Sequence, residues 1–212
     1  MQYHNAPVLS QRPRKSTLCL IFPIRKFNSR SIYTKIYKDG FRSLYYLCRV
    51  MAKKIEKTNA ARLLDKAGIA YSLIPYEFDE NDLAAQHVAE SLGQDIAKVF
   101  KTLVLHGDKS GYIVCVIPGD KEVDLKALAK VSGNKKVEMI PMKDLLQVTG
   151  YIRGGCSPIG MKKRFPTYFH TTATDHDVIY VSAGVRGLQI EIAPQNLITF
   201  VQATVAEVAT VL

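Results

Sequence analysis

The first residue that could do chemistry is Lys101, which interrupts the apolar run Val99–Leu105. Alternate side chains of a strand share a face, and both faces of this run are otherwise apolar. A lysine there either lies at a strand end, with its ammonium in water, or points into a cleft. In a cleft, the ammonium offers three donors to an ester carbonyl or a phosphate.

The second candidate is a glycine-rich stretch, Gly154-Gly155-Cys156-Ser157-Pro158-Ile159-Gly160. Glycines let the backbone approach a ligand closely, and successive N–H groups can form an anion-binding nest. The same composition is typical of an ordinary connecting loop, and the stretch matches neither a P-loop nor a dinucleotide-binding fingerprint. By itself it favours the connecting loop.

Cys156 raises the alternative of a cysteine nucleophile, which needs a base, usually histidine, close in space. The sequence places none of the candidate bases near this thiol: His87, His106, His170 and His176. A cysteine between glycines is more often a small apolar filler, so catalysis by this thiol is disfavoured.

Two basic clusters, Lys135-Lys136 and Lys162-Lys163-Arg164, are of a kind that usually lies on a solvated surface. The second cluster follows the glycine-rich stretch directly and could contact a phosphate backbone beside it. The sequence shows no RNA-binding motif with interleaved aromatic residues. It also shows no metal-ligand spacing, and we expect no metal site.

The elements that must position these residues follow from periodicity and capping. Helices are predicted from a cap at Thr58 or Asn59 to Ala67, from Asp82 to Gly93, from Asp124 to Val131, over 143–148, and after Thr204 with Glu207 as a capping box. Strands are predicted over 69–76, 99–105, 112–117, 137–140, 178–182 and 188–193, with a hairpin loop at 106–111. Interleaved helices and strands with a hairpin favour a mixed sheet in an α/β or α+β fold, not a doubly wound parallel one.

Charge divides the chain of 212 residues, whose formal net charge is +10. Residues 1–50 hold ten Lys and Arg with Asp39 as the single acid, whereas residues 51–212 hold 19 basic and 18 acidic residues. We predict a basic N-terminal extension over 1–50, disordered or absent from the native protein, and a single domain over 51–212. The extension could come from an over-extended reading frame with Met51 as the true start, or be a targeting peptide, or be a basic arm.

The four cysteines, Cys19, Cys48, Cys115 and Cys156, show no C-x-x-C spacing. A disulfide framework is not expected in a domain of this size, which favours a reducing compartment, and we expect the cytoplasm. The apolar run Leu18–Phe22 is too short to span a bilayer, so no membrane association is predicted.

Short motifs follow one another in a set order over roughly residues 56–210. They are KVFKTLV at 98–104, KKVEM at 135–139, TGY at 149–151, GGCSPIGMKKR at 154–164, VSAG at 181–184 and RGL at 186–188, with Glu191 beyond. This order and spacing resemble the bacterial YbaK/EbsC proteins, the Cys-tRNA(Pro) deacylases. Those proteins are relatives of the editing domain inserted in bacterial prolyl-tRNA synthetases.

The resemblance implies an α+β fold with a mixed, partly closed, barrel-like sheet surrounded by helices. It implies an aminoacyl-tRNA deacylase that removes cysteine wrongly attached to proline tRNA and needs neither a metal nor an organic cofactor. Lys101 matches the family's essential lysine, and Tyr76 matches a tyrosine lining the same pocket. The pocket wall that holds the aminoacyl ester matches Gly154, Gly155, Ser157, Pro158 and Gly160, and the expected tRNA contacts are Lys162, Lys163 and Arg164.

One position departs from the family pattern, since the aspartate expected after Arg186-Gly187-Leu188 is Gln189 here. An amide cannot act as a general base or offset a lysine charge. If the aspartate only shapes the pocket, activity is kept; if it tunes the lysine, this protein is slower or prefers another aminoacyl group.

The resemblance further implies that the substrate's own thiol attacks the ester, so the protein need not supply a nucleophile. Lys101 and backbone N–H groups near Gly154 and Gly155 would orient the ester and stabilise its oxyanion. The alternatives are an Ala-tRNA(Pro) deacylase in which water attacks, and a non-catalytic module that binds tRNA or a synthetase. The near-neutral body predicts weak affinity for tRNA alone, which favours prolyl-tRNA synthetase as the partner that delivers it.

Overall fold

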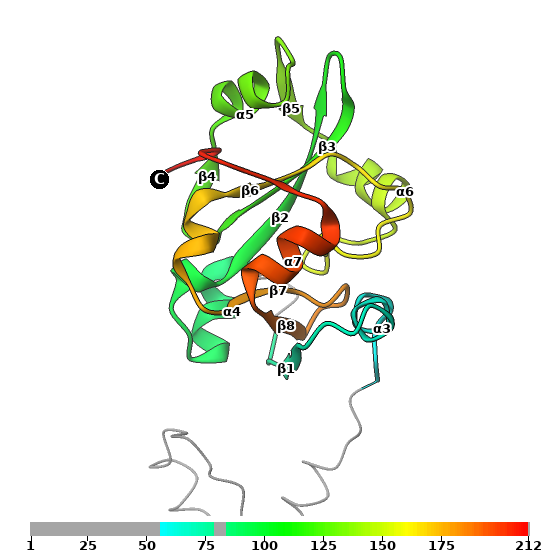
Figure 1. The fold of residues 1–212 in the computed structure, drawn as a ribbon, viewed down its shortest axis with the longest axis vertical. Helices are drawn as coiled ribbons and strands as arrows, with labels where there is room; N and C mark the ends of the chain where they lie inside the picture. Colours follow the sequence, from blue (N-terminus) through cyan, green and yellow to red (C-terminus); the bar gives the residue numbers. More distant parts are fainter. Residues whose placement is uncertain (1–55, 79–83, 212) are drawn as a thin grey trace, which may run out of the picture. The chain divides into compact units, whose positions relative to one another are not determined.

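The computed structural model describes residues 56–78 and 84–211, and the chain from Ile55 to Leu212 forms one compact unit. The long hairpin of β2 and β3 crosses its centre, with α5 and β5 at one end and β1, β7 and β8 at the other (Figure 1). The helices are α3 Asn59–Lys66, α4 Ala85–Leu92, α5 Leu125–Val131, α6 Leu145–Thr149 and α7 Pro194–Val201, and the 3-10 turns are η1 Ile96–Lys98, η2 Met142–Asp144 and η3 Thr171–Asp175.

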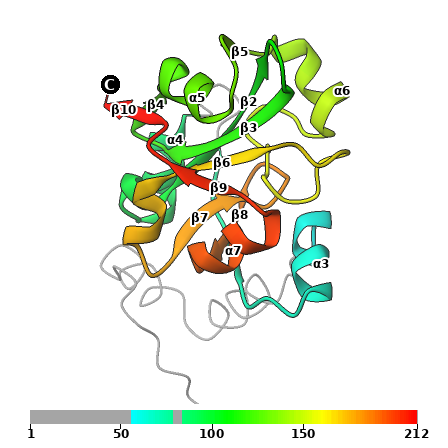
Figure 2. The same cartoon turned by 45° about the horizontal axis from the view of Figure 1, so that its top comes forward.

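The strands of the described residues form three sheets. They are β1 Ser72–Pro75, β2 Phe100–Gly107, β3 Gly111–Pro118, β4 Lys121–Val123, β5 Val137–Met139, β6 Thr167–His170, β7 Ile179–Ser182, β8 Leu188–Ile192, β9 Thr204–Ala206 and β10 Ala209–Val211. The largest sheet has the order β5-β2-β3-β6-β9, and the others are β1-β8-β7 and β10-β4. Figure 2 shows β2, β3, β6 and β9 side by side.

The prediction of a mixed α+β fold is confirmed, because β6 pairs in parallel with β3 and β9 while β2 pairs antiparallel with β3 and β5. The predicted partial closure into a barrel is not confirmed. The strand order leaves β5 and β9 as the two edges of the five-stranded sheet, so within the described residues this sheet does not close.

Local capping explains why most of the predicted helices form. Thr58 accepts a hydrogen bond from the Ala61 N–H at 3.2 Å at the start of α3. Asp124 accepts from both Lys126 and Ala127 N–H at 2.9 Å and so starts α5. Gly150 has a φ of +85° and ends α6 in the left-handed conformation that glycine adopts without strain.

The predicted start of α4 at Asp82 lies outside the described residues, although Gly93 ends that helix as expected, with a φ of +63°. The predicted hairpin loop at 106–111 was too long, since His106 and Gly107 belong to β2 and Gly111 begins β3.

The predicted C-terminal helix after Thr204 is wrong, because Thr204–Ala206 is β9 and Ala209–Val211 is β10. β9 pairs with β6, a segment more than 30 residues away in sequence, and Glu207 bonds to Thr171 instead of capping a helix. The sequence analysis also missed α7, β4 and β6. Long-range pairing outweighs a local capping pattern here.

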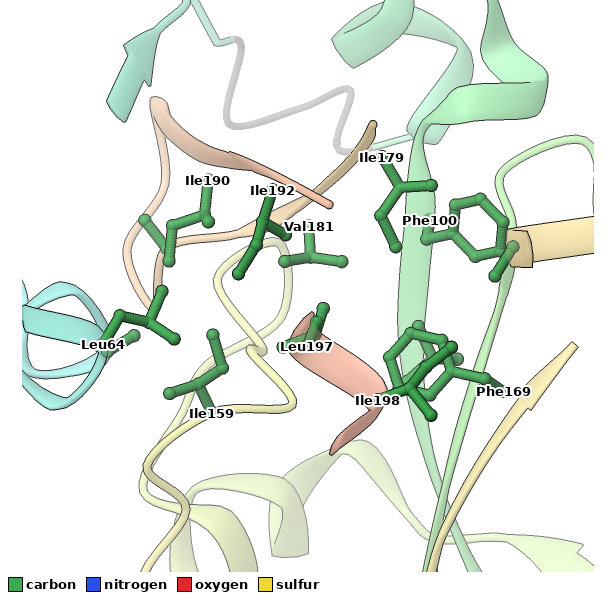
Figure 3. Close-up of a cluster of buried hydrophobic side chains, with 14 of the residues drawn as sticks. Leu64, Phe100, Ile159, Phe169, Ile179, Val181, Ile190, Ile192, Leu197 and Ile198 are labelled. Carbon is green, nitrogen blue, oxygen red and sulfur yellow. The ribbon is translucent and has the colours of Figure 1, made fainter. Parts of the chain in front are cut away.

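The two faces of the β2–β3 hairpin carry separate cores. Val114, Val116 and Phe169 face a cluster with β7, β8, α3 and α7. Figure 3 shows Leu64 of α3 at one side of this cluster and Phe100 and Phe169 at the other, with Leu197 of α7 between them. The opposite face carries the alternating strand residues Leu105, Ile113, Cys115 and Ile117, and it packs on Leu128 of α5.

Asn134 ties the segment after α5 to the β2–β3 hairpin. Its Oδ1 accepts from the N–H groups of Lys109 and Ser110 at 2.9 and 3.0 Å, and its Nδ2 donates to the Ser110 and Ser132 hydroxyls at 2.8 Å. The side chain is 8% exposed. A Cβ added to Gly107 would lie 2.5 Å from it, so only glycine fits beside this amide.

We expect Asn134→Ala to lower the free energy of unfolding by about 2–4 kcal/mol, because it leaves partly buried donors without an acceptor. Urea unfolding followed by circular dichroism measures the change. Lys135→Ala, at the exposed neighbouring position, is the control and should change stability by less than about 0.5 kcal/mol. An equally small effect of Asn134→Ala would contradict this role of the amide.

None of the helices within 56–78 and 84–211 has both the length and the apolar character that crossing a bilayer requires. The predicted extension over 1–50 lies outside the described residues.

Candidate active site

A cavity of about 590 Å³ lies against the first half of β2. Residues 99–104 of the chain form one wall, and Met139 and Ile140 close the end next to β5. The other walls come from α4, from the start of the glycine-rich loop, and from the neighbouring strands β7 and β8 through Ser182 and Gln189. Segments far apart in sequence therefore share one concave site.

The edge of β2 that borders this cavity carries backbone groups without a strand partner. The Gly119 N–H donates to the Val99 carbonyl at 2.7 Å, which sets the register of the β2–β3 ladder. Alternate residues of an antiparallel ladder point their backbone groups to opposite edges, so Thr102 and Val104 direct theirs away from β3. The Ile140 N–H donates to the Val104 carbonyl at 3.3 Å, consistent with this direction. β5 pairs only with Leu105–Gly107, which leaves the Thr102 backbone facing the cavity.

Lys101 lines this cavity, as the cleft interpretation of the sequence predicted. Its Nζ donates to the Gly119 carbonyl at 3.1 Å, and its side chain is half-buried. Burial lowers the pKa of Lys101 below its ordinary value of 10.5, while the charges of Glu122 and Asp120 act in the opposite direction. One hydrogen bond occupies one of three ammonium donors, so the group can also bind a substrate oxygen.

The glycine-rich loop enters the cavity through its first residues only. Gly154, with a φ of +80°, and Cys156 line the cavity with Lys101. The Gly155 N–H already donates to the Ile152 carbonyl at 3.0 Å, so of the two predicted backbone donors Gly154 is the one at the cavity. A Cβ on Gly155 would lie 3.3 Å from the Val185 Cα, so close packing against Val185 is the reason for a glycine at this position.

The rest of the loop lies elsewhere and has contacts that maintain its shape. The Tyr151 hydroxyl donates to the Ile159 carbonyl at 2.6 Å, and the Ser157 Oγ accepts from the Ile159 N–H at 3.3 Å. Gly160 has a φ of +73° and packs against α3. Ser157 is fully buried, and Pro158 and Gly160 line a second, smaller cavity. The structure thus separates these three residues from Lys101.

Tyr76 does not line the cavity either. Its backbone N–H donates to the Gly187 carbonyl at 3.0 Å, and this hydrogen bond links the end of β1 to the turn before β8. Its ring packs at the margin of a small apolar cluster that contains Val88, Val99 and Tyr180. Val88 and Val99 of this cluster line the cavity, so Tyr76 packs against a cluster that contributes to its wall.

Gln189 does line the cavity and is 5% exposed, and among the described residues its Oε1 finds no hydrogen-bond partner. The Thr102 Oγ1, in the same cavity, also lacks one. Unpartnered buried polar atoms are costly, and two in one cavity indicate a polar ligand. Sequence reasoning missed Thr102 and Ser182, whose only signals were their places in the motifs around Lys101 and before Gly184.

The predicted tRNA-contact residues differ in their surroundings. The Lys162 Nζ donates to the Leu146 and Gln147 carbonyls at 3.2 Å, so this ammonium stabilises the end of α6. Lys163 and Arg164 are exposed and line the second cavity. Lys162 thus uses two of its three donors within the protein, whereas Lys163 and Arg164 line a cavity that an external anion could enter.

Cys156 is not an activated nucleophile. Burial raises the pKa of its thiol to about 12, so the group is protonated at neutral pH. Among the described residues, no histidine lines the cavity. The buried His170 instead contacts Lys121 and accepts from the Val208 N–H. The described residues hold no group of three or more His, Cys, Asp or Glu side chains that could ligate a metal ion.

We expect Cys156→Ala to retain ester-cleaving activity within about threefold of the unchanged protein, because a protonated thiol contributes no nucleophile. Initial rates at neutral pH, with thermal unfolding as the folding control, check this expectation. A loss of a hundredfold or more in a folded variant would restore the nucleophile hypothesis.

The sequence and structure of known proteins match this chain closely. The model of the aminoacyl-tRNA editing domain matches residues 79–200, which include Lys101, Gly154 and Gln189. The protein named "Putative Cys-tRNA(Pro)/Cys-tRNA(Cys) deacylase EbsC" of Enterococcus faecalis is 52% identical over 162 residues, covering 76% of this chain and 99% of that protein. A proline–tRNA ligase of Thermosipho africanus is 29% identical over 86 residues, which are 41% of this chain and 15% of the ligase.

Two solved structures share the fold. One is described as the hypothetical protein APE2540, with a TM-score of 0.65 and 21% identity over 70% of this chain and 97% of that one. The other is described as "a putative trans-editing enzyme for prolyl tRNA synthetase", with a TM-score of 0.64 and 19% identity over 73% of this chain and 99% of that one. The family model spans more than half of the chain, and EbsC aligns over nearly its full length. The resemblance predicted from the motifs is thus confirmed, and the chain belongs to the aminoacyl-tRNA editing domain family.

Proposed function

We propose that this protein is a trans-editing deacylase that removes cysteine from mischarged Cys-tRNA(Pro). The observation that carries the proposal is the shared cavity of Lys101, Gly154 and Gln189, which presents an ammonium, a glycine backbone and an unpartnered amide oxygen to one space. The name of EbsC supports this substrate, and the two solved structures support only the fold.

The donors of the site match an ester whose carbonyl oxygen gains charge. The Lys101 ammonium, held by Gly119, and the backbone at Gly154 would stabilise the developing oxyanion. The edge of β2 at Thr102 adds backbone groups that can orient the aminoacyl part. These groups are fixed by a sheet and a packed loop, so little reorganisation is needed during the reaction.

The unpartnered Gln189 Oε1 matches the α-ammonium group of an aminoacyl ester. A carbonyl oxygen can accept from that group, and the hydroxyl of Thr102 is a second acceptor in the same cavity. Because an amide carries no charge, Gln189 would bind the ammonium without offsetting the charge of Lys101. This arrangement favours the interpretation that the family's aspartate shapes the pocket.

The nucleophile in this proposal is the thiol of the substrate. Its sulfur attacks the carbonyl carbon of the same cysteinyl residue, the bond to the ribose oxygen breaks, and that oxygen takes a proton as the tRNA leaves. Water then opens the resulting thiolactone to free cysteine. The protein contributes position and charge stabilisation, and the protonated Cys156 takes no part.

Prolyl-tRNA synthetase is the partner we propose for delivery of the substrate, because residues 51–212 carry almost no net charge for binding tRNA. We further propose that the functional domain starts near Met51 and that the protein acts in the cytoplasm. Mass spectrometry of the native N-terminus tests the first, and fractionation of cells tests the second.

The decisive experiment measures deacylation of Cys-, Ala- and Pro-tRNA(Pro) by the full chain, with and without prolyl-tRNA synthetase. The proposal expects fast release of cysteine and slow release of the other two. Equal release of alanine would instead indicate an Ala-tRNA(Pro) deacylase in which water attacks. Binding of tRNA or synthetase without turnover of any substrate would indicate a non-catalytic module.

We expect the rate of this reaction to pass through a maximum with pH. It rises as the substrate thiol, with an ordinary pKa of about 8.5, becomes a thiolate. It falls as the Lys101 ammonium loses its proton, at a pH below 10.5 because burial lowers that pKa. Rates corrected for uncatalysed ester hydrolysis test this, and an alkaline fall that persists in Lys101→Met would assign it to another group.

A further inference from the structure

Outside the cavity described above, three aromatic side chains form a row across neighbouring segments of the large sheet. His106 of β2 lies opposite Tyr112 of β3, with ring centroids 5.2 Å apart, and Phe165, just before β6, lies 6.0 Å from Tyr112. His106 is exposed and Tyr112 is 38% exposed. The neighbouring rings meet edge to face, with interplanar angles of 79° and 77°, and Phe165 is only partly exposed. Exposed faces of aromatic rings on a sheet are surfaces on which unpaired bases stack.

The row continues into the second cavity, which has a volume of about 250 Å³ and shares Phe165 with it. Leu63 of α3 and Phe200 of α7 form apolar walls, and Lys163 and Arg164 contribute the charged part of the lining. Of the residues that the structure describes, none that lines this cavity is acidic. This lining suits a ligand that has a flat or apolar part and also carries negative charge.

The other end of the row carries both cations and acids. Lys135 and Lys136 precede β5, whose Glu138 lies opposite His106. Acids offset these cations: the Glu138 carboxylate pairs with the Lys136 Nζ at 2.7 Å, and the Asp108 carboxylate accepts from the Lys135 N–H at 2.8 Å. At the Phe165 end, the Arg164 guanidinium uses one donor on Gln202 at 3.3 Å and has others for a phosphate.

The glycine-rich loop links this surface to the first cavity. Gly154 lines the cavity of Lys101, while Pro158 and Gly160, a few residues on, line the cavity of Phe165. A polynucleotide bound on the row would therefore lie beside a loop whose first residues line the first cavity.

We propose that the aromatic row with the second cavity binds a single-stranded stretch of RNA, whose bases stack on Tyr112 and Phe165 and whose phosphates contact Lys163 and Arg164. The proposal rests on the proposed function only in taking the RNA to be the 3′ part of the tRNA substrate. An apolar peptide of a protein partner would use the apolar walls, but it gives no reason for Lys163 and Arg164 beside a partly exposed aromatic ring.

The test measures binding of the full chain to a fluorescein-labelled, uncharged single-stranded RNA that ends in CCA. Tyr112→Leu with Phe165→Leu keeps apolar volume and removes the rings, and we expect about tenfold weaker binding. Lys163→Gln with Arg164→Gln should reduce the salt slope of the binding constant by about 1.4, since each lost phosphate contact is worth about 0.7. Lys130→Gln is the control, because α5 packs on the opposite face of the sheet. It should change neither the RNA affinity nor the salt slope.

Wild-type RNA affinity in both double variants would overturn the proposal. So would unchanged RNA binding combined with weaker binding of prolyl-tRNA synthetase, which would make this a protein-docking surface. If Phe165→Leu unfolds the protein, the single variant Tyr112→Leu still tests the proposal. The Tyr112 ring is exposed, and its loss should weaken RNA binding about threefold or more. RNA binding by this surface in a protein that releases no cysteine would support this inference and refute the proposed function.

Discussion

Lys101→Met is expected to lower kcat/KM for deacylation of Cys-tRNA(Pro) by about 10²–10³-fold, the loss typical of removing one donor from an oxyanion site. Methionine keeps the length and most of the apolar contacts of the lysine stem but has no ammonium. The folded state should not lose stability, because burial already disfavours the charged form of Lys101. Single-turnover deacylation together with thermal unfolding separates an effect on chemistry from an effect on folding.

Lys98→Met provides the matched control, because Lys98 lies in η1 just before β2 and does not line the cavity. We expect this variant to retain activity within about threefold. Undiminished activity of a folded Lys101→Met protein would remove the ammonium from the mechanism. Equal losses in both variants would point to a general effect of positive charge on the encounter with tRNA.

Replacing the cysteinyl group of the substrate by a seryl group is expected to slow deacylation by at least about 10²-fold, because the attacking atom changes from a good nucleophile to a poor one at the same position. Serine is close to cysteine in size, and its hydroxyl could still enter the cavity of about 590 Å³. S-methylcysteinyl-tRNA(Pro) blocks the sulfur itself and should be equally slow. The measurement is release of labelled amino acid from each tRNA under identical conditions.

Alanyl-tRNA(Pro) completes this set, since its side chain has no nucleophilic atom. If seryl, S-methylcysteinyl and alanyl esters are all cleaved at nearly the rate of the cysteinyl ester, water is the nucleophile and the substrate thiol has no role. A fast cysteinyl ester with slow analogues, together with full activity of Cys156→Ala, would leave the thiol of the substrate as the attacking group.

Much of the fold was predictable because its signals are local. Thr58 and Asp124 cap helices through bonds to N–H groups two or three residues away, and Gly150 ends α6 through its own backbone angle. The β2–β3 hairpin pairs neighbouring segments. In contrast, β9 and β6 pair across more than 30 residues, and the local pattern at Thr204 indicated a helix. Pairing between distant segments depends on the whole core and leaves little trace in a short window of sequence.

The sequence by itself determined which residues are candidates for the chemistry of this protein: a lysine within an apolar strand, a glycine-rich loop, and a glutamine where the family has an aspartate. Only the tertiary structure decided where these residues lie and which neighbours they contact. It divides the loop between two cavities, turns the Lys162 ammonium onto α6, and brings His106, Tyr112 and Phe165 into one row. The sequence gives the type of each side chain directly. Its neighbours in space, however, depend on strand pairing and packing between segments far apart along the chain.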